Sequence, residues 1–531
     1  MSTTLIITVI VAYFLVLMGI SFLTSRKATN DSFFLGERKS PWYLVSFGMI
    51  GASLSGVTFL SVPGWVGNEA NQFSYMQAVF GYLFGYFVVA YVLLPLYYRL
   101  NLISIYQYLE ERFGFWSYKT GASFFLVSRI IGASVRLLLV ANVFQLILFD
   151  DWGIRFEFTV AISVLLIWIY TSRGGIKTIV WTDTLQTAFM LLSVILTVYF
   201  VSDILNLSEQ GGIVSTVSES NYSKIFFFDD INGSNHFWKH FLGGMFITIG
   251  MTGLDQDMMQ KNLSCRNLKD AQKNMISMAA VLVVVNLIFL SLGALLYMYA
   301  ESRGIVPESS DMLFAEVALS SEAGTLIGVL FLLGLIAAAY SSADSALTSL
   351  TTSFSVDFLG VGGKNKKDSS TTLNVQKDTI DSAMIRKNAI AVQRNEEMTR
   401  KIVHVVMSAV IILVVILLKH FTAGAAIGLL MKFAGFTYGP LIGMFFFGIL
   451  TKRNLKDGVI PIIAILSISI TALCWYFSAG APGANADGSG IFGNYAFGFE
   501  LILFNALINF ILLYAASFAF KSIHHEISTS R

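Results

Sequence analysis

Residues 335–358 read LIAAAYSSADSALTSLTTSFSVDF, a stretch long enough to cross a bilayer as a helix. On a helix at about 100° per residue, its small residues share one face: Ala338, Ser341, Ser342, Ser345, Thr348, Ser349 and Thr352. Such residues let another helix approach closely, and their hydroxyls are ligands for a hard cation. Asp344 lies at the edge of that face, and a carboxylate in a membrane is costly unless it faces a partner, an ion or water. The stretch leaves two interpretations, helix packing and an ion site.

The composition decides the class of protein. The chain has 531 residues, of which 55% are hydrophobic and 13% charged, and its mean hydropathy is +0.69. A soluble protein of this length carries more charge, and a β-barrel would show short alternating segments. We therefore predict an all-α polytopic membrane protein. The two cysteines, Cys265 and Cys474, indicate neither a disulfide framework nor a metal site.

The apolar runs predict about 13 transmembrane helices. They cover residues 4–25, 43–66, 75–99, 118–148, 156–172, 178–202, 237–259, 275–299, 325–358, 402–421, 424–450, 458–478 and 498–520. With the N-terminus outside, only five of the 35 Lys and Arg residues lie in outer segments, namely Arg155, Lys224, Lys239, Arg303 and Lys419. Because positive charge collects on the cytoplasmic side, we predict a multi-pass protein of the cell membrane with its N-terminus outside and its C-terminus in the cytoplasm.

Two of the predicted spans contain clusters of glycine. The second carries GMIGASLSGVTFLSVPGW at 48–65, and the seventh carries FLGGMFITIGMTGLDQDMMQ at 241–260. Glycine is common in membrane helices, but two interrupted spans five helices apart are typical of inverted-repeat transporters, whose broken helices meet at mid-membrane. Unwound backbone there frees carbonyls for a cation and half-helix N-termini for an anion.

Three charged residues lie inside predicted spans without an obvious reason. Arg136 lies deep in the fourth span, and Arg129 lies two turns earlier on nearly the same face. Each needs either a carboxylate from another helix or an anionic substrate, and the sequence leaves both open. Asp183, one turn into the sixth span, either complements the helix dipole or joins Asp344 and Ser345 in holding a monovalent cation.

Three motifs resemble the sodium/solute symporter family, which includes sodium/galactose, sodium/proline and sodium/sialic acid symporters. They are FFLGERKSPWYLVSFGMIGASLSGVTFLSVP at 33–63, GGIKTIVWTDTLQ at 174–186 and AAAYSSADSALTSLTTSFSVDF at 337–358. The resemblance covers nearly the whole chain and implies a five-plus-five inverted repeat with two broken helices. The implied units are an extra helix and inner loop at 1–42, a first repeat at 43–202, an outer loop at 203–236, a second repeat at 237–450 with a cytoplasmic insertion at 360–400, and two further helices with a tail at 451–531.

The resemblance also implies sodium ligands. One sodium would be held by three backbone carbonyls and two hydroxyls, from Gly51, Leu54, Ala338, Ser341 and Ser342. Some members hold a second sodium, and the matching positions here are Asp183, Asp344 and Ser345. Asp344 departs from the serine that is usual in the sialic acid symporters. Its carboxylate either strengthens a cation site or is itself paired or protonated.

Similarity to the bacterial sodium/sialic acid symporters implies a set of substrate-binding positions. They are Ser55, Thr58, Phe73, Gln77, Arg136 and Phe246. Hydroxyl groups with a guanidinium suit a carboxylate. Gly56 stands where those symporters have a serine, and a threonine at position 58 also occurs in monocarboxylate carriers of the family.

We therefore expect a sodium-coupled symporter that imports a small polar organic solute by alternating access, with Na+ as the coupling ion and an anionic sugar such as sialic acid as the substrate. The alternatives are sodium symport of a neutral sugar or a monocarboxylate, proton-coupled symport through Asp183 and Asp344, and a solute sensor. No enzyme is expected, because the sequence carries neither an HExxH nor a GxSxG motif. The expected partners are the solute, sodium ions and membrane lipid, and no nucleic acid.

Overall fold

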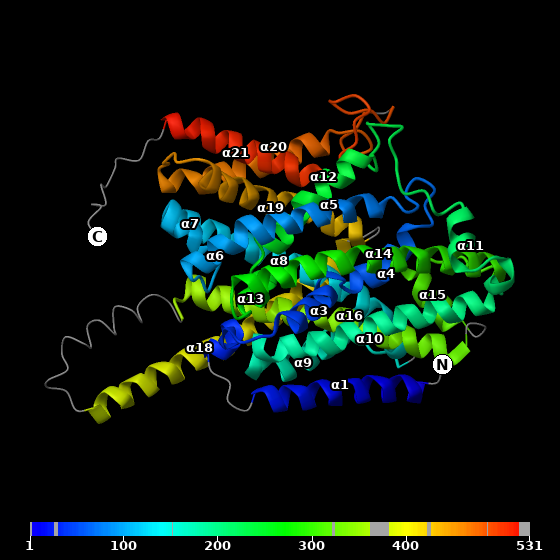
Figure 1. Ribbon diagram of the computed structural model, residues 1–531, viewed down its shortest axis with the longest axis horizontal. Coiled ribbons are helices and arrows are strands. Elements are labelled where there is room, and N and C mark those ends of the chain that lie inside the picture. Colours follow the sequence, from blue (N-terminus) through cyan, green and yellow to red (C-terminus); the bar gives the residue numbers. More distant parts are fainter. Residues whose placement is uncertain are drawn as a thin grey trace.

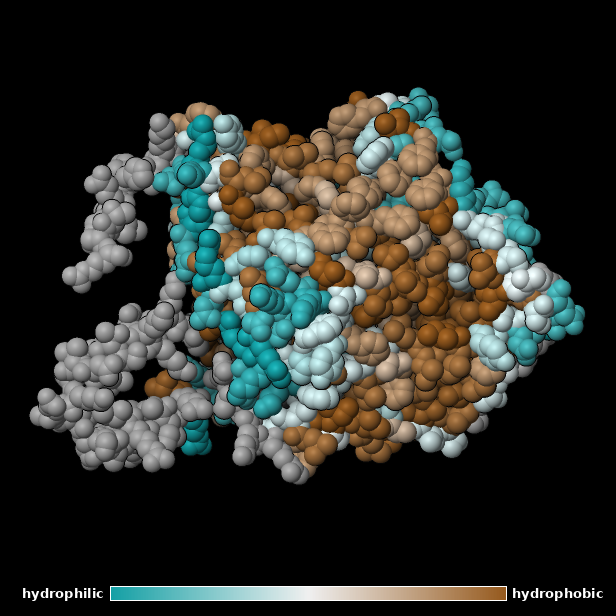
Figure 2. Space-filling model, in the orientation of Figure 1, coloured by the Kyte–Doolittle hydropathy of each residue, from teal (hydrophilic) through white to brown (hydrophobic). Residues whose placement is uncertain are grey.

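The computed structural model describes residues 3–25, 30–150, 152–320, 324–361, 382–421, 426–485 and 487–519. Within these ranges the regular structure is helical and contains no strand. The long helices run side by side through one bundle (Figure 1). An apolar band covers the middle of the bundle, and hydrophilic residues gather at its two ends (Figure 2). This band is what lipid tails require of a membrane protein, and it confirms the predicted all-α membrane class.

Within the described ranges, ten helices are long and apolar enough to cross a membrane, and a bent pair brings the number to 11. They are α1 (Thr3–Ser25), the bent pair α3 (Trp42–Ser53) and α4 (Gly56–Trp65), α5 (Tyr75–Val88) with η2 (Val89–Leu93) and α6 (Leu94–Leu100), α8 (Phe115–Phe144) with η3 (Gln145–Phe149), α10 (Ile176–Ile204), α14 (Leu268–Arg303), α16 (Gly324–Ser353) with η7 (Phe354–Phe358), α18 (Ser382–Phe421), α19 (Ala426–Leu450), α20 (Ile460–Tyr476) and α21 (Leu501–Ala519).

The two other predicted spans correspond to shorter helices. The first is α9 (Phe156–Gly174), and the second is built from α12 (Phe237–Thr248), the π-helix η5 (Ile249–Gly253) and α13 (Gln256–Leu263). Each of the 13 predicted positions therefore holds helix, but the number of 13 membrane crossings is not confirmed. The short helices α2 (Asn30–Leu35), α7 (Gln107–Arg112), α11 (Ile213–Glu219) and α15 (Leu313–Leu319) lie between spans.

Both glycine-rich spans are interrupted, as predicted. In the second span, α3 and α4 meet at an angle of 56°, because Leu54 and Ser55 leave helical backbone geometry. In the seventh span the interruption falls at Leu254 and Asp255, after the glycines and not among them. The Asp255 carboxylate accepts a hydrogen bond from the Asp257 N–H at 2.9 Å and so caps the start of α13.

Glycines allow close backbone contact at two seams. Along the first, a Cβ at Gly48 or Gly51 of α3 would collide with Asp183 or Thr187 of α10. Along the second, α5 meets α12, and a Cβ at Gly81 would collide with the backbone of α12. The first seam places the broken span directly against the helix that carries Asp183.

Helix α16 lies in the interior of the bundle (Figure 1). Every residue from 334 to 353 is buried, and the helix packs against α3, α4, α8, α10 and α18. Its hydroxyl face is therefore enclosed by protein and not by lipid. The predicted insertion at 360–400 is described only in part: residues 362–381 lie outside the described ranges, and α18 begins at Ser382.

Candidate functional site

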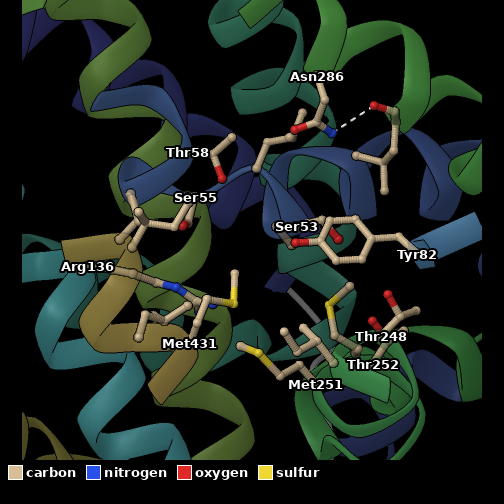
Figure 3. Close-up of a pocket in the computed structure, with 18 of the residues that line it drawn as sticks. Ser53, Ser55, Thr58, Tyr82, Arg136, Thr248, Met251, Thr252, Asn286 and Met431 are labelled. Carbon is tan, nitrogen blue, oxygen red and sulfur yellow. Dashed lines mark hydrogen bonds between the residues drawn. The ribbon is translucent and has the colours of Figure 1, made fainter. Parts of the chain in front are cut away.

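A cavity lies beside the break between α3 and α4 (Figure 3). Its walls come from these two helices and from α5, α8, α12 with η5, α14 and α19. The polar groups in the walls are those of Ser53, Ser55, Thr58, Tyr75, Tyr82, Tyr86, Arg129, Arg136, Thr248, Thr252 and Asn286. The apolar walls include Ile247, Met251, Met258, Leu282, Leu430 and Met431. A mostly apolar cleft with a few convergent polar groups is the usual form of a small-molecule site.

The break itself supplies polar backbone to this cavity. Ser55 precedes α4, and Thr58 lies in its first turn. The first N–H groups of a helix lack partners within the helix and carry partial positive charge. The start of α4 is thus suited to an anionic group, and the two hydroxyls lie beside it.

Arg136 adds a full positive charge to the same wall. Its side chain is 6% exposed and extends from α8 toward the cavity near Met431 (Figure 3). Among the described residues its Nε and Nη1 atoms have no hydrogen-bond partner. Buried guanidinium nitrogens without an acceptor are costly, so these two nitrogens are suited to bind an acceptor group of a ligand in the cavity.

Arg129, two turns earlier on α8, is satisfied by protein. It forms an ion pair with Asp257 and lies 3.7 Å from the Asp255 carboxylate. The Tyr438 hydroxyl of α19 donates a hydrogen bond to Asp255. These four residues join α8, the start of α13 and α19 at one point beside the cavity, and the sequence analysis did not single out Asp255 and Asp257.

The structure does not bring all the expected substrate residues together. Ser55, Thr58 and Arg136 line the cavity, whereas Phe73, Gln77 and Phe246 do not. The Gln77 side chain bonds to the backbone of Asn235 and Phe227, each at 3.0 Å. The N–H of Phe73 donates to the Lys224 carbonyl at 3.1 Å. Counting without gaps placed these two at mid-membrane depth, but α5 begins only at Tyr75, so they lie beneath the loop between α11 and α12.

The expected ligands of the first sodium lie on helices that touch. Gly51 and Leu54 end α3, whose last carbonyls have no partner within the helix. Ala338, Ser341 and Ser342 lie on α16 and are buried. A Cβ placed on Gly56 would lie 3.7 Å from Ala339, which fixes the break next to this stretch of α16. The hydroxyl of Ser341 donates to Asp183 at 2.8 Å, which leaves its lone pairs available.

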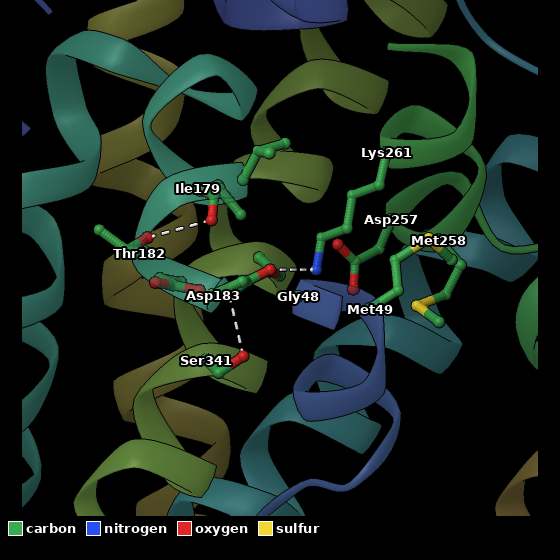
Figure 4. Close-up of polar contacts among 12 residues, drawn as sticks. Gly48, Met49, Ile179, Thr182, Asp183, Asp257, Met258, Lys261 and Ser341 are labelled. Atoms are coloured by element: carbon green, nitrogen blue, oxygen red, sulfur yellow. Dashed lines mark hydrogen bonds and ion pairs between the residues drawn. The ribbon is translucent and has the colours of Figure 1, made fainter. Parts of the chain in front are cut away.

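At the expected second sodium position a lysine lies against Asp183 (Figure 4). The ammonium of Lys261, from α13, lies 2.7 Å from Asp183 Oδ2. The Ser345 hydroxyl donates to the same oxygen at 3.5 Å. Asp344 accepts a hydrogen bond from the Tyr170 hydroxyl at 2.9 Å. Asp183 and Ser345 thus meet, while Lys261 stands at the point where the sequence analysis expected a cation.

The signal for Lys261 was present in the sequence. All eight residues of α13, QDMMQKNL, are buried although five of them are polar or charged. A polar run at the end of an apolar span indicates internal partners, since lipid provides none.

Comparison with known proteins settles the family. The profile described as "Sodium:solute symporter family" matches residues 33–431. The chain belongs to the sodium:solute symporter family. It is accordingly a multi-pass membrane transporter that couples solute movement to Na+, and it is not an enzyme.

The sodium:solute symporter is similar to characterised relatives along most of its length. It is 25% identical over 482 residues to the sodium/sialic acid symporter NanT of Aliivibrio fischeri, a match covering 87% of this chain and 85% of that protein. Human sodium-coupled monocarboxylate transporter 2 is 30% identical over 259 residues, or 46% of this chain and 39% of that one. A solved substrate-bound, outward-open Na+-coupled sialic acid symporter superposes with a TM-score of 0.75 at 20% identity, covering 97% of this chain and 98% of that chain. This likeness confirms the fold.

Proposed function

We propose that this symporter transports a small organic anion whose carboxylate binds Arg136, Ser55 and Thr58. The observation that carries the proposal is the Arg136 guanidinium, which is buried at the cavity wall with Nε and Nη1 unpartnered among the described residues. A carboxylate accepts two parallel hydrogen bonds from a guanidinium. A neutral sugar offers only hydroxyl groups and would leave the charge without a counter-ion.

The rest of the cavity favours a polyhydroxylated anion. Opposite Arg136 the walls carry the hydroxyls of Tyr82, Thr248 and Thr252 (Figure 3), and Tyr86 also lines the cavity. Asn286 is engaged, because its amide donates to the Leu282 carbonyl at 2.8 Å. Sialic acid and monocarboxylates, the solutes named for the relatives, share a carboxylate, and sialic acid adds several hydroxyls that would fill this second polar wall. An anionic sugar such as sialic acid is therefore the proposed substrate.

The sodium that drives transport is proposed to bind at Gly51, Leu54, Ala338, Ser341 and Ser342. In support, the end of α3 supplies carbonyls without helical partners, and α16 supplies the hydroxyls. A cation there would tie the broken span to α16. Asp183, Asp344 and Ser345 form a second proposed cation position one turn further along α16.

Alternating access then follows from the two halves of the bundle. Sodium binding stabilises the outward-open state by joining α3 to α16, and substrate binds beside the break. Rocking of the bundle exposes both sites to the other side, where loss of sodium lets Ser341 and Ser342 separate from α3. The proposed orientation has the N-terminus outside and the C-terminus in the cytoplasm, with the apolar band of Figure 2 in contact with lipid.

Calorimetry on the purified protein in sodium buffer tests the substrate class. The ligand panel contains sialic acid, a simple monocarboxylate, glucose and galactose. Wild type should bind a carboxylated ligand, and Arg136→Gln should weaken that binding by about 2–5 kcal/mol, as for one partner of a buried charge pair. Arg136→Lys is the matched control and should recover only part of the loss, because an ammonium lacks the planar fork.

Two outcomes would contradict the proposal. If wild type binds glucose or galactose tightly and no carboxylated ligand, Arg136 has a structural role and the substrate is neutral. Uptake into proteoliposomes decides the coupling ion with the same ligands. If uptake follows an imposed pH gradient with sodium absent, the proposed sodium site is wrong for this chain.

A further inference from the structure

We propose that the ammonium of Lys261 permanently occupies the second cation position, so that the symporter binds one sodium ion per cycle. The inference rests on the proposed first sodium site and concerns only the group formed by Asp183, Asp344 and Ser345. It assigns to Lys261 the role of a tethered cation that takes the place of a second coupling ion.

The contacts of Asp183 leave little for a metal ion. Its Oδ2 atom faces the ammonium of Lys261 at 2.7 Å and accepts from Ser345 at 3.5 Å. Its Oδ1 atom accepts from Ser341 at 2.8 Å. Side-chain exposure is 2% for Lys261 and 1% for Asp183, so water does not screen this pair. A hard cation gathers several oxygen ligands, and here both carboxylate oxygens are already engaged.

The surroundings of Lys261 hold it in this position. One residue before it, Gln260 donates to the Phe34 carbonyl at 2.6 Å and to Thr352 at 2.9 Å. One residue after it, the Asn262 side chain accepts from Asn274 at 2.7 Å. Rotation of α13 that removed the ammonium from Asp183 would break both sets of buried hydrogen bonds. It would also leave a buried ammonium without a counter-ion, which is strongly unfavourable.

Asp344 does not provide an alternative sodium site. Its Oδ2 accepts from the Tyr170 hydroxyl at 2.9 Å, and only Oδ1 is without a hydrogen-bond partner among the described residues. A sodium drawn to this oxygen would also be repelled by the positive charge of Lys261, which acts electrostatically on Asp344 and forms an ion pair with Asp183. Two cations at a few ångströms in a buried site repel each other strongly.

The lysine also acts on the first site through Ser341. The Ser341 hydroxyl donates a hydrogen bond to Asp183. The lone pairs of the Ser341 oxygen are therefore directed away from that carboxylate and remain available to bind sodium. Lys261 balances the charge of Asp183 and thereby keeps this orientation. Lys261 is thus a positioning residue that connects α13 with the hydroxyl face of α16.

Equilibrium binding of radioactive sodium to the purified, substrate-free protein tests the inference. Wild type should bind one sodium per chain with a Hill coefficient near one. Lys261→Gln removes the charge and should allow a second sodium, while Lys261→Arg keeps the charge and should bind one. Ser342→Ala, a lesion of the first site only, should raise the half-saturating sodium concentration about tenfold, or about 1.4 kcal/mol, with the stoichiometry unchanged.

The outcomes separate the two proposals. Two sodium ions bound to wild type overturn the role of Lys261, whether or not the variants fold. One sodium bound to a folded Lys261→Gln protein overturns it as well, because the lysine would then not be what excludes the second ion. No sodium bound to wild type, or no effect of Ser342→Ala, counts against the first site and hence against the proposed function.

Discussion

Arg129 and Arg136 lie seven residues apart on one helix, on nearly the same face, yet their surroundings are opposite. Arg129 pairs with Asp257 and lies near Asp255. Both side chains line the cavity, but Arg136 leaves Nε and Nη1 without a hydrogen-bond partner among the described residues, whereas Arg129 leaves only Nε. The helix, the burial and the residue type are the same, so the difference comes from Asp255 and Asp257 at the start of α13, which lie within ion-pair distance of Arg129.

The comparison teaches what a buried charge indicates in a transporter. A paired arginine such as Arg129 fastens helices, because breaking the pair leaves uncompensated charges in the interior. A buried arginine with unpartnered nitrogens, such as Arg136, lowers the stability of the ligand-free protein. Such a residue is expected where a bound ligand offsets this cost. Substitutions at the two positions should therefore have opposite consequences for the protein without its ligand.

The largest effect is expected from Arg129→Met. The change keeps the volume but leaves Asp255 and Asp257 buried without their cation, which should cost about 3–5 kcal/mol of stability. The thermal unfolding midpoint of the detergent-purified protein should fall by several degrees, with or without substrate. An unchanged midpoint would mean that the ion pair of Arg129 with Asp257 does not stabilise the fold. Arg129 would then not differ from Arg136 in the way proposed here.

A smaller effect is expected from Tyr438→Phe. The Tyr438 hydroxyl donates to Asp255, and a hydrogen bond to a charged acceptor contributes about 1.5–3 kcal/mol. Unfolding of this variant should begin at a temperature between those of wild type and Arg129→Met. In the double variant the two losses should not add, since both act on the same carboxylate. Strict additivity would show that Tyr438 and Arg129 act independently.

The smallest effect on stability is expected from Arg136→Met. An apolar side chain of similar size removes a buried charge that no described residue pairs with at Nε or Nη1, so the ligand-free protein should be unchanged or more stable by up to about 1 kcal/mol. The same variant should lose carboxylate binding in calorimetry. A large drop in the unfolding midpoint without ligand would instead make Arg136 a second structural arginine.

The sequence predicted the fold well because its main signals are local. Apolar runs fix the positions of the helices, and the glycines near Ser53 and Leu254 mark spans that are interrupted. The two arginines could not be told apart in this way. Their difference depends on Asp257, which is 128 residues away from Arg129 in the chain, and a sequence pattern does not report such distant contacts.

The site residues show the same limit. Ser55 lies in the break and Thr58 in the first turn after it, so a local motif is enough to associate both with the cavity that they line; their role in substrate binding stays a prediction. Gln77 was placed by counting along the chain, and the turn before α5 moved it to the loop between α11 and α12. The sequence did not indicate the role of Lys261, because a lysine near the end of a span is usually expected to extend to the membrane surface. In the structure its side chain points inward and forms an ion pair with Asp183.

The glycine seam between α5 and α12 has a consequence for biogenesis. At Gly81 and Gly85 the surface of α5 is in close contact with α12, and α12 is synthesised about 160 residues later. While the chain leaves the ribosome, this surface must stay open to lipid until the seventh span is inserted. The two halves of the chain therefore cannot mature as separate units, and assembly of the bundle waits for translation to pass well into the second half.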